Sequence, residues 1–134
     1  MKRVDPDRLA GIDPCMGFEF VDQRTVEFSE TDMAGIVHFA NFFRWMESAE
    51  HAFLRSLGFS VHASGDGGTT GWPRVKVSCE YLQPLRFEDE VETVLSIKEV
   101  RTRSVCYGFE FRHVVEKAGN VVVAKDSPQT ELEL

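Results

Sequence analysis

The sequence predicts an α+β fold in which a five-stranded antiparallel sheet curls around one long central helix. A single helical period fills residues 40–57, with apolar side chains on most sides of the helix. Four of the five strand-like segments follow this helix with short connections, which favours antiparallel pairing. A curled sheet encloses such a helix. The alternative, a helix lying flat on the sheet, would show a cleaner polar face.

The first strand is expected in residues 18–28, "FEFVDQRTVEF", where apolar and polar side chains alternate. Residues 1–17 are expected to form a loosely held arm. A chain of 134 residues with 43% hydrophobic residues is long enough for one core and too short for two. Residues 18–134 are therefore predicted to form a single domain.

The helix begins with "ANFFRWMESAE" and shows apolar side chains at steps of three and four residues. These side chains are Phe42, Phe43, Met46, Ala49, Phe53, Leu54 and Leu57, and Trp45 widens their stripe. Gly58 tolerates the left-handed conformation that commonly ends a helix, and Phe59 is placed for the accompanying hydrophobic contact. The sequence therefore predicts the end of the helix as well as its period.

Residues 60–73, "SVHASGDGGTTGWP", are rich in glycine and predict a long loop that acts as a lid or a mobile crossover. Four strand-like segments follow, namely "RVKVSCEYL", "DEVETVLSIKEV", "RSVCYGFEFRHVVE" and "NVVVAKD". The third of these, residues 103–116, is long, aromatic and β-branched. We expect it to form a sheet edge that a partner chain covers.

Composition excludes several classes of protein. The formal net charge of −7 disfavours nucleic-acid binding, which depends on clustered lysine and arginine. The chain lacks a membrane-spanning apolar run and an apolar leader segment, so we expect a cytoplasmic protein without membrane contact. Cys15, Cys79 and Cys106 are widely spaced and form no CxxC pair, so we expect reduced thiols and no zinc site.

The segment "VEFSETDMAGIVHFANFFRWMESAE" resembles the part of the 4-hydroxybenzoyl-CoA thioesterase family that reads roughly E-F-x-x-x-D-x-x-G-I-V-x-[YFH]-x-N-Y-x-R-[WY]. "IKEVRTRS" resembles the basic turn between the third and fourth strands of that family. The resemblance runs from about Phe20 to Val123. It implies the hot-dog fold, oligomers built on a dimer, hydrolysis of acyl-CoA thioesters and a catalytic aspartate at Asp32.

The chemistry of the residues agrees with that implication. A thioester has a good leaving group, so its hydrolysis requires a carboxylate that attacks or activates water and a donor for the developing oxyanion. Asp32 precedes the buried helix, whose first N–H groups lack intrahelical partners. Gly35 lets the backbone approach the ligand closely. A helix cap or an Asx turn is the structural alternative for Asp32.

The resemblance implies further roles around Asp32. The Phe39 N–H matches the donor to the thioester carbonyl, seven positions after the aspartate. His38 is expected to be packed or half-exposed, with a hydrogen bond to substrate or to Asp32 as the alternative. Asn41 matches a family asparagine that is a substrate-site candidate, although capping or loop bracing is its expected role.

Arg101 and Arg103 match basic positions that in the family meet the nucleotide phosphates of coenzyme A. Thr102 departs from the family pattern, because a basic residue is expected between them. Arginines at the mouth of the site on an acidic protein suit a polyanionic carrier.

Glu47 and His51 lie four positions apart on the predicted helix, but no further ligand accompanies them, so a surface pair is expected and no metal site. Glu47 keeps an alternative role as a helix-borne catalytic carboxylate, although the glycine-rich approach of that thioesterase class is missing.

The sequence thus predicts an acyl-CoA thioesterase, a homodimer or homotetramer that needs no cofactor, since coenzyme A is part of the substrate. Two alternatives stay open. A hot-dog hydratase or dehydratase would pair His38 with a carboxylate, and a non-catalytic module would bind acyl-CoA without turnover.

Overall fold

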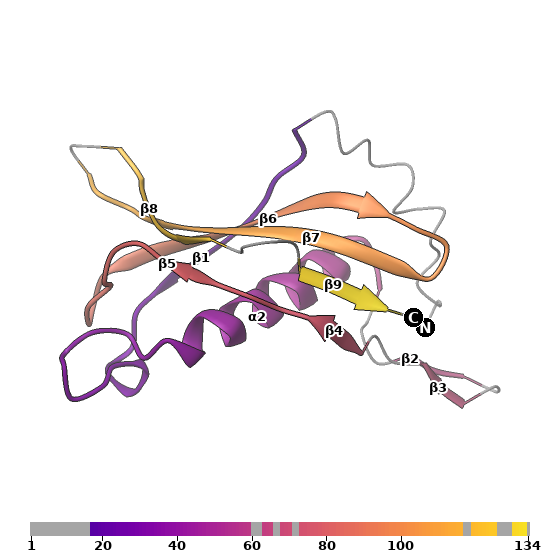
Figure 1. Cartoon of the computed structure of the whole chain (residues 1–134), viewed down its shortest axis with the longest axis horizontal. Helices are drawn as coiled ribbons and strands as arrows, with labels where there is room; N and C mark the ends of the chain where they lie inside the picture. Colours follow the sequence, from indigo (N-terminus) through magenta and orange to yellow (C-terminus); the bar gives the residue numbers. More distant parts are fainter. Residues whose placement is uncertain are drawn as a thin grey trace.

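Seven strands in five positions form the main sheet, and all neighbouring strands are antiparallel (Figure 1). β1 (Phe20–Thr25), β6 (Glu90–Val100) and β7 (Ser104–His113) occupy three positions. β8 (Val121–Lys125) and β9 (Thr130–Glu133) both pair with β7, and β5 (Glu80–Tyr81) and β4 (Arg74–Lys76) pair with β8 and β9 respectively. The predicted hot-dog sheet is confirmed, with its last two positions each built from two pieces.

This computed structural model describes residues 17–59, 63–65, 68–70, 73–116, 119–125 and 130–133. The predicted arm lies outside the described residues except for Gly17, and so does Cys15. Within the described part of the chain, Cys79 is half-buried and Cys106 is buried, and neither forms a disulfide. Among the described residues, no helix is long and apolar enough to cross a membrane.

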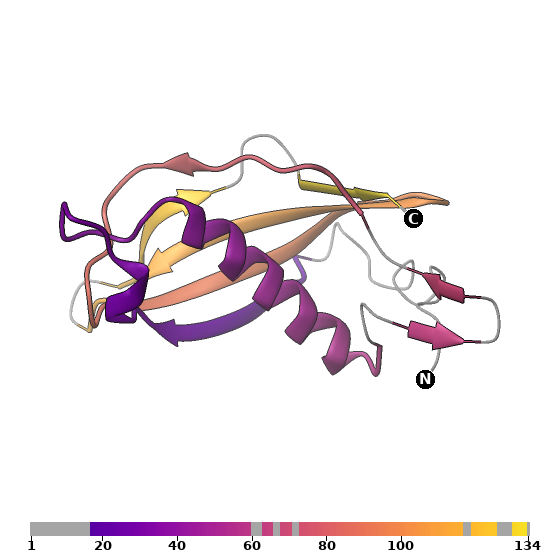
Figure 2. The same cartoon turned by 90° about the horizontal axis from the view of Figure 1, so that it is seen from below.

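The long helix is α2 (Ala40–Ser56), and it lies along one face of the curled sheet (Figure 2). Phe53 packs against Phe20 of β1 and Tyr107 of β7, while Phe42 meets Phe111 edge-on. The opposite side of α2 is exposed at Arg44, Glu47, Ser48 and Arg55. The helix is therefore less enclosed than its apolar stripe predicts, because one chain covers only the face that meets the sheet.

The C-terminal end of α2 confirms the helix end predicted at Gly58. Gly58 has a φ of +80°, its N–H donates to the Arg55 carbonyl, and the Phe59 N–H donates to the Leu54 carbonyl. This pair of bonds is a Schellman motif, and the buried Phe59 ring supplies its hydrophobic contact.

Two expectations were wrong. The described part of residues 60–73 contains a small hairpin, β2 (Ala63–Gly65) with β3 (Gly68–Thr70), instead of a structureless loop. β7 lies in the middle of the sheet, paired with β6 on one side and with β8 and β9 on the other. The sheet edges are β1 and the β5/β4 position, so the long apolar strand needs no partner chain to cover it.

Candidate active site

Asp32 occupies the first position of a tight hairpin turn. The Gly35 N–H donates to the Asp32 carbonyl at 3.0 Å, and the Asp32 N–H donates to the Ile36 carbonyl at 2.9 Å. Thr31 and Val37 pair across the hairpin. Gly35 has a φ of +77°, which identifies a three-residue hairpin loop that ends in a left-handed residue. Glycine is thus required here for the turn itself, and this turn sets the position of Asp32.

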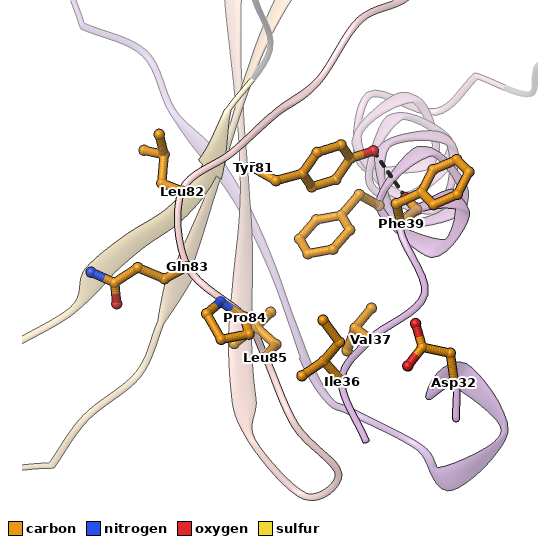
Figure 3. A pocket seen from close by; sticks show the side chains of 10 residues that line it. Asp32, Ile36, Val37, Phe39, Tyr81, Leu82, Gln83, Pro84 and Leu85 are labelled. Atoms are coloured by element: carbon orange, nitrogen blue, oxygen red, sulfur yellow. Dashed lines mark hydrogen bonds between the residues drawn. The ribbon is translucent and has the colours of Figure 1, made fainter. Parts of the chain in front are cut away.

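The Asp32 side chain makes an Asx turn and points toward the cavity beside it (Figure 3). Its Oδ1 accepts the Ala34 N–H at 2.8 Å, whereas no hydrogen bond within the described part of the chain engages Oδ2. The carboxylate does not cap α2, whose N-cap residue is Phe39 with no side-chain cap bond. One oxygen is therefore fixed by the turn, and the other stays available for chemistry.

The first N–H groups of α2 leave one donor unused. His38, Asn41 and Phe42 donate to backbone carbonyls, and the Ala40 N–H donates to His38 Nδ1 at 3.3 Å. The Phe39 N–H has no acceptor among the described residues. Phe39 lines the same cavity as Asp32. A free N–H at the positive end of a helix suits an oxyanion.

The cavity has a volume of about 430 Å³ and two walls (Figure 3). The hairpin and the start of α2 form one wall, and residues 81–85 form the other. The lining residues are Asp32, Ile36, Val37, Phe39, Phe42, Tyr81, Leu82, Gln83, Pro84 and Leu85. The Val37 N–H donates to the Leu85 carbonyl at 2.8 Å, so the two walls are hydrogen-bonded to each other.

Tyr81 joins the walls through its side chain. Its hydroxyl donates to the Phe39 carbonyl at 3.1 Å, and its ring meets Phe42 edge-on with centroids 5.2 Å apart. Burial and the nearby Cys79 raise the pKa of Tyr81 to about 12, so the hydroxyl keeps its proton at neutral pH. Sequence reasoning missed this residue, because a tyrosine at a strand end carries no motif.

His38 is more exposed than predicted and does not line the cavity. Its ring stacks on Phe39 with centroids 4.6 Å apart, and its Nδ1 accepts the Ala40 N–H. Within the described part of the chain, His38 therefore forms no acid–base pair with a carboxylate in this cavity, as the hydratase alternative would require.

Asn41 is buried and braces the hairpin. Its Nδ2 donates to the Glu30 carbonyl at 2.8 Å. Asn41 is not among the residues that line the cavity, so the structure shows it in the bracing position.

Arg101 and Arg103 lie at the far end of the molecule from Asp32. Both are exposed in the turn between β6 and β7, where Arg101 pairs with Glu99 at 2.8 Å. Asp32 lies near the start of β6, and the 11 residues of that strand span roughly 36 Å at 3.3 Å per residue. Figures 1 and 2 show the two regions at opposite ends. One chain does not bring them together.

The predicted helix pair of Glu47 and His51 lies on α2, with Glu47 exposed and His51 half-buried. Among the residues that the structure describes, no three histidine, cysteine or acidic side chains gather in a way that would hold a metal ion. Glu47 is also absent from the residues that line the cavity beside Asp32.

Comparison with known proteins identifies one family model and several relatives. Residues 34–119 match the thioesterase superfamily. A protein of Aquifex aeolicus, provisionally named as an esterase, is 38% identical over 106 residues, which cover 79% of this chain and 78% of that protein. A 1,4-dihydroxy-2-naphthoyl-CoA hydrolase of Prochlorococcus marinus (strain NATL2A) is 30% identical over 105 residues, covering 73% of this chain and 68% of that protein.

A solved structure shows the same fold. The structure of a gentisyl-coenzyme A thioesterase superposes with a TM-score of 0.69 at 30% sequence identity. The superposition covers 84% of this chain and 85% of the other.

Proposed function

Because the chain belongs to the thioesterase superfamily and hydrolyses acyl-CoA thioesters, we propose that Asp32 and the Phe39 N–H carry out this hydrolysis. One observation supports the assignment above all others. A carboxylate oxygen and a helix N–H, both without a hydrogen-bond partner among the described residues, belong to residues that line the same apolar cavity. Neither group alone suffices, since hydrolysis needs both attack on the carbonyl and stabilisation of the resulting oxyanion.

In the proposed reaction, Asp32 takes a proton from water as the water oxygen bonds to the thioester carbon, or Asp32 Oδ2 itself makes that bond. The carbonyl oxygen becomes an oxyanion that accepts the Phe39 N–H. The C–S bond then breaks and coenzyme A leaves as a thiolate, which takes the proton from Asp32 in the water route and a proton from solvent in the direct route. Direct attack leaves an anhydride on Asp32, which water cleaves to the free acid. The chemistry requires no cofactor, because coenzyme A enters as part of the substrate.

For the acyl group we propose an aryl acid. Phe39, Phe42 and Tyr81 place three aromatic rings on the cavity, and aromatic rings favour edge-on and offset contacts with another ring. Two related proteins carry the names of aryl-CoA hydrolases, for gentisyl and 1,4-dihydroxy-2-naphthoyl groups. A volume of about 430 Å³ suits one or two rings.

A thiol-release assay across short, long and aromatic acyl-CoAs tests this function. We expect kcat/KM to be highest for aryl-CoAs. A higher value for long aliphatic chains would contradict the aryl assignment and leave the hydrolase assignment intact, whereas the absence of thiol release from every class would contradict both.

We propose that a second copy of this chain pairs with the β5/β4 edge. This edge carries exposed apolar side chains at Val75, Val77, Tyr81 and Leu82, and an unpaired apolar edge is prone to pair with another strand. Residues 81–85 of the cavity continue from the same edge, so pairing there would cover the cavity as well. Either a homodimer or a tetramer made of two such dimers satisfies this geometry.

Pairing of two chains also explains how Arg101 and Arg103 could reach a substrate. Since Arg101 and Arg103 lie far from Asp32 within one chain, we propose that they serve the site of the partner subunit and hold the nucleotide phosphates there. A cytoplasmic location is part of the proposal.

We expect Arg101→Ala with Arg103→Ala to raise KM for CoA thioesters about tenfold, with little effect on a thioester that lacks the nucleotide. Lost phosphate contacts remove uniform binding, which affects KM and leaves kcat unchanged. Steady-state assays with an acyl-CoA and its N-acetylcysteamine analogue measure the difference. Equal losses for both substrates would show that the basic turn is structural.

Mixing two impaired variants tests the composite site. We expect an Asp32→Asn chain and an Arg101/Arg103 double mutant to regain activity when they form heterodimers, because each mixed dimer then holds one intact site. Native mass spectrometry verifies that heterodimers form, and a thiol-release assay at low substrate concentration measures activity. Activity no higher than that of either parent would place both elements in one chain or remove the arginines from the site.

A further inference from the structure

Glu30 lies at the base of the hairpin that carries Asp32, and its carboxylate meets three donors. Oε1 accepts Arg24 at 2.9 Å and the Trp45 indole N–H at 2.8 Å, and Oε2 accepts the Glu27 N–H at 2.8 Å. The Glu30 side chain is 13% exposed, and Arg24 is 26% exposed. Charge-assisted bonds in such a sheltered place are stronger and more rigid than exposed ones.

The main chain of Glu30 makes further bonds. Its carbonyl accepts the His38 N–H at 2.9 Å and Asn41 Nδ2 at 2.8 Å. His38 is the residue immediately before Phe39, so one bond from Glu30 closes the hairpin just ahead of the free N–H. The bond from Asn41 ties the same carbonyl to the first turn of α2.

These contacts connect Glu30 to three neighbouring elements. Arg24 comes from β1, Glu27 precedes the 3-10 helix η2 (Phe28–Glu30), and Trp45 belongs to α2. Arg24 also lies over the Trp45 ring, with its guanidinium carbon 5.1 Å from the ring centroid. The hairpin from residue 30 to residue 38 is thus fixed at one residue against both the sheet and the helix.

We propose that Glu30 is a positioning residue for thioester hydrolysis, and this inference rests on the proposed roles of Asp32 and Phe39. Glu30 does not line the cavity and so does not touch the substrate. It acts by holding Asp32 and the Phe39 N–H at a fixed separation, since Asp32 lies within the hairpin that Glu30 closes and Phe39 follows directly after it. Misplacement of a catalytic group by about 1 Å costs on the order of a hundredfold in rate.

The three donors explain why this residue is an acid. An ionised carboxylate is an acceptor only, whereas a glutamine of the same shape carries two N–H donors. In either orientation, the glutamine NH₂ would face a donor: Glu27 N–H on one side, or Trp45 and Arg24 on the other. Glu30→Gln therefore changes little in volume and disrupts the hydrogen bonds that hold the hairpin.

We expect Glu30→Gln to lower kcat about tenfold, with KM for an aryl-CoA changed less than about twofold. The matched control is Glu90→Gln, because Glu90 also accepts two side-chain bonds, from Gln23 and Thr25, between β1 and β6 and away from the cavity. We expect that control to keep the wild-type kcat. Circular dichroism and thermal unfolding establish that each variant is folded at the assay temperature.

A double-mutant cycle separates positioning from general loss of structure. If Glu30 acts through Asp32, Glu30→Gln should lower the residual rate of Asp32→Asn by less than about twofold, since the group it positions is already gone. An equal tenfold loss in both backgrounds, or an unchanged kcat in folded Glu30→Gln, would overturn the inference. Near wild-type activity of Asp32→Asn alone would instead overturn the proposed catalytic aspartate.

Removing single donors gives the same test if Glu30→Gln does not fold. Trp45→Phe and Arg24→Met each remove one donor to Oε1 and leave the carboxylate in place. We expect each to lower kcat about threefold when Asp32 is present and to have no effect in the Asp32→Asn background. Unchanged kcat in both folded variants would overturn the inference.

Discussion

Asp32→Asn is expected to lower kcat at least a hundredfold while the protein keeps its fold and stability. Loss of a general base or a nucleophile has an effect of this size. The fold should persist because the asparagine Oδ1 accepts the Ala34 N–H as the aspartate does, so the Asx turn is kept. Thiol release measures kcat, and thermal unfolding measures stability.

The matched control for this variant is Asp89→Asn. Asp89 also holds a turn, since its Oδ2 accepts the Arg86 N–H at 2.8 Å, but it does not line the cavity. We expect this control to retain the wild-type kcat. If Asp32→Asn turned over substrate at nearly the wild-type rate, the carboxylate would have only its structural role in the turn.

Arg74→Ala is expected to lower the free energy of unfolding by about 3 kcal/mol, because it leaves a buried carboxylate unpaired. Glu50 on α2 is only 2% exposed, and its Oε2 accepts Arg74 of β4 at 2.7 Å. Urea unfolding of wild type and variant at pH 8 measures the loss. A comparison is Arg112→Ala, whose partners Glu19 and Glu110 lie nearer the surface, where ion pairs contribute about 1 kcal/mol or less.

The stability that Arg74→Ala loses should depend on pH. Burial raises the pKa of Glu50 above its ordinary value of 4.5, although Arg74 lowers it in part. An acid with a raised pKa in the folded state binds its proton more tightly than in the unfolded state. Its favourable contribution is therefore complete below the unfolded pKa and is lost as pH rises through the folded pKa.

Without Arg74, burial acts on Glu50 unopposed and the folded pKa rises further. We therefore expect the destabilisation to be smaller at pH 5 than at pH 8. The same cost at both pH values would show that Glu50 is not the group left unpaired. Replacing the whole pair, as Glu50→Leu with Arg74→Met, should be close to neutral, because two well-packed apolar side chains avoid burying a charge.

Local signals in the sequence were sufficient for the helix and its end. The apolar positions Phe42, Met46, Ala49 and Phe53 belong to one continuous period, and Gly58 adopts the left-handed conformation that the sequence predicts. The order of the strands depends on contacts between distant segments, which no local pattern contains. Residues 104–109 are all buried. Burial of six consecutive residues is typical of a strand inside the sheet, so the predicted edge position was wrong.

The candidate site likewise contains residues that a local motif predicts and residues that only the fold brings together. Asp32, Gly35 and Phe39 are close in sequence, so a motif of a few residues was enough to predict that they act together. Tyr81 contacts the Phe39 carbonyl from 42 positions away, and only the folded sheet brings it there. No local pattern predicts the hydrogen bonds of Glu30, because its partners come from β1 and from α2.

The two walls of the cavity differ in their proposed roles. The hairpin and the start of α2 carry both proposed catalytic groups, whereas residues 81–85 supply five of the ten lining residues and none of the proposed reacting atoms. Substitutions in Leu82, Gln83 or Pro84 can therefore accumulate during evolution without altering the geometry of bond cleavage. Such a division permits substitutions in one short surface segment to change the acyl preference, while the hairpin and the start of α2 keep the proposed catalytic groups in place.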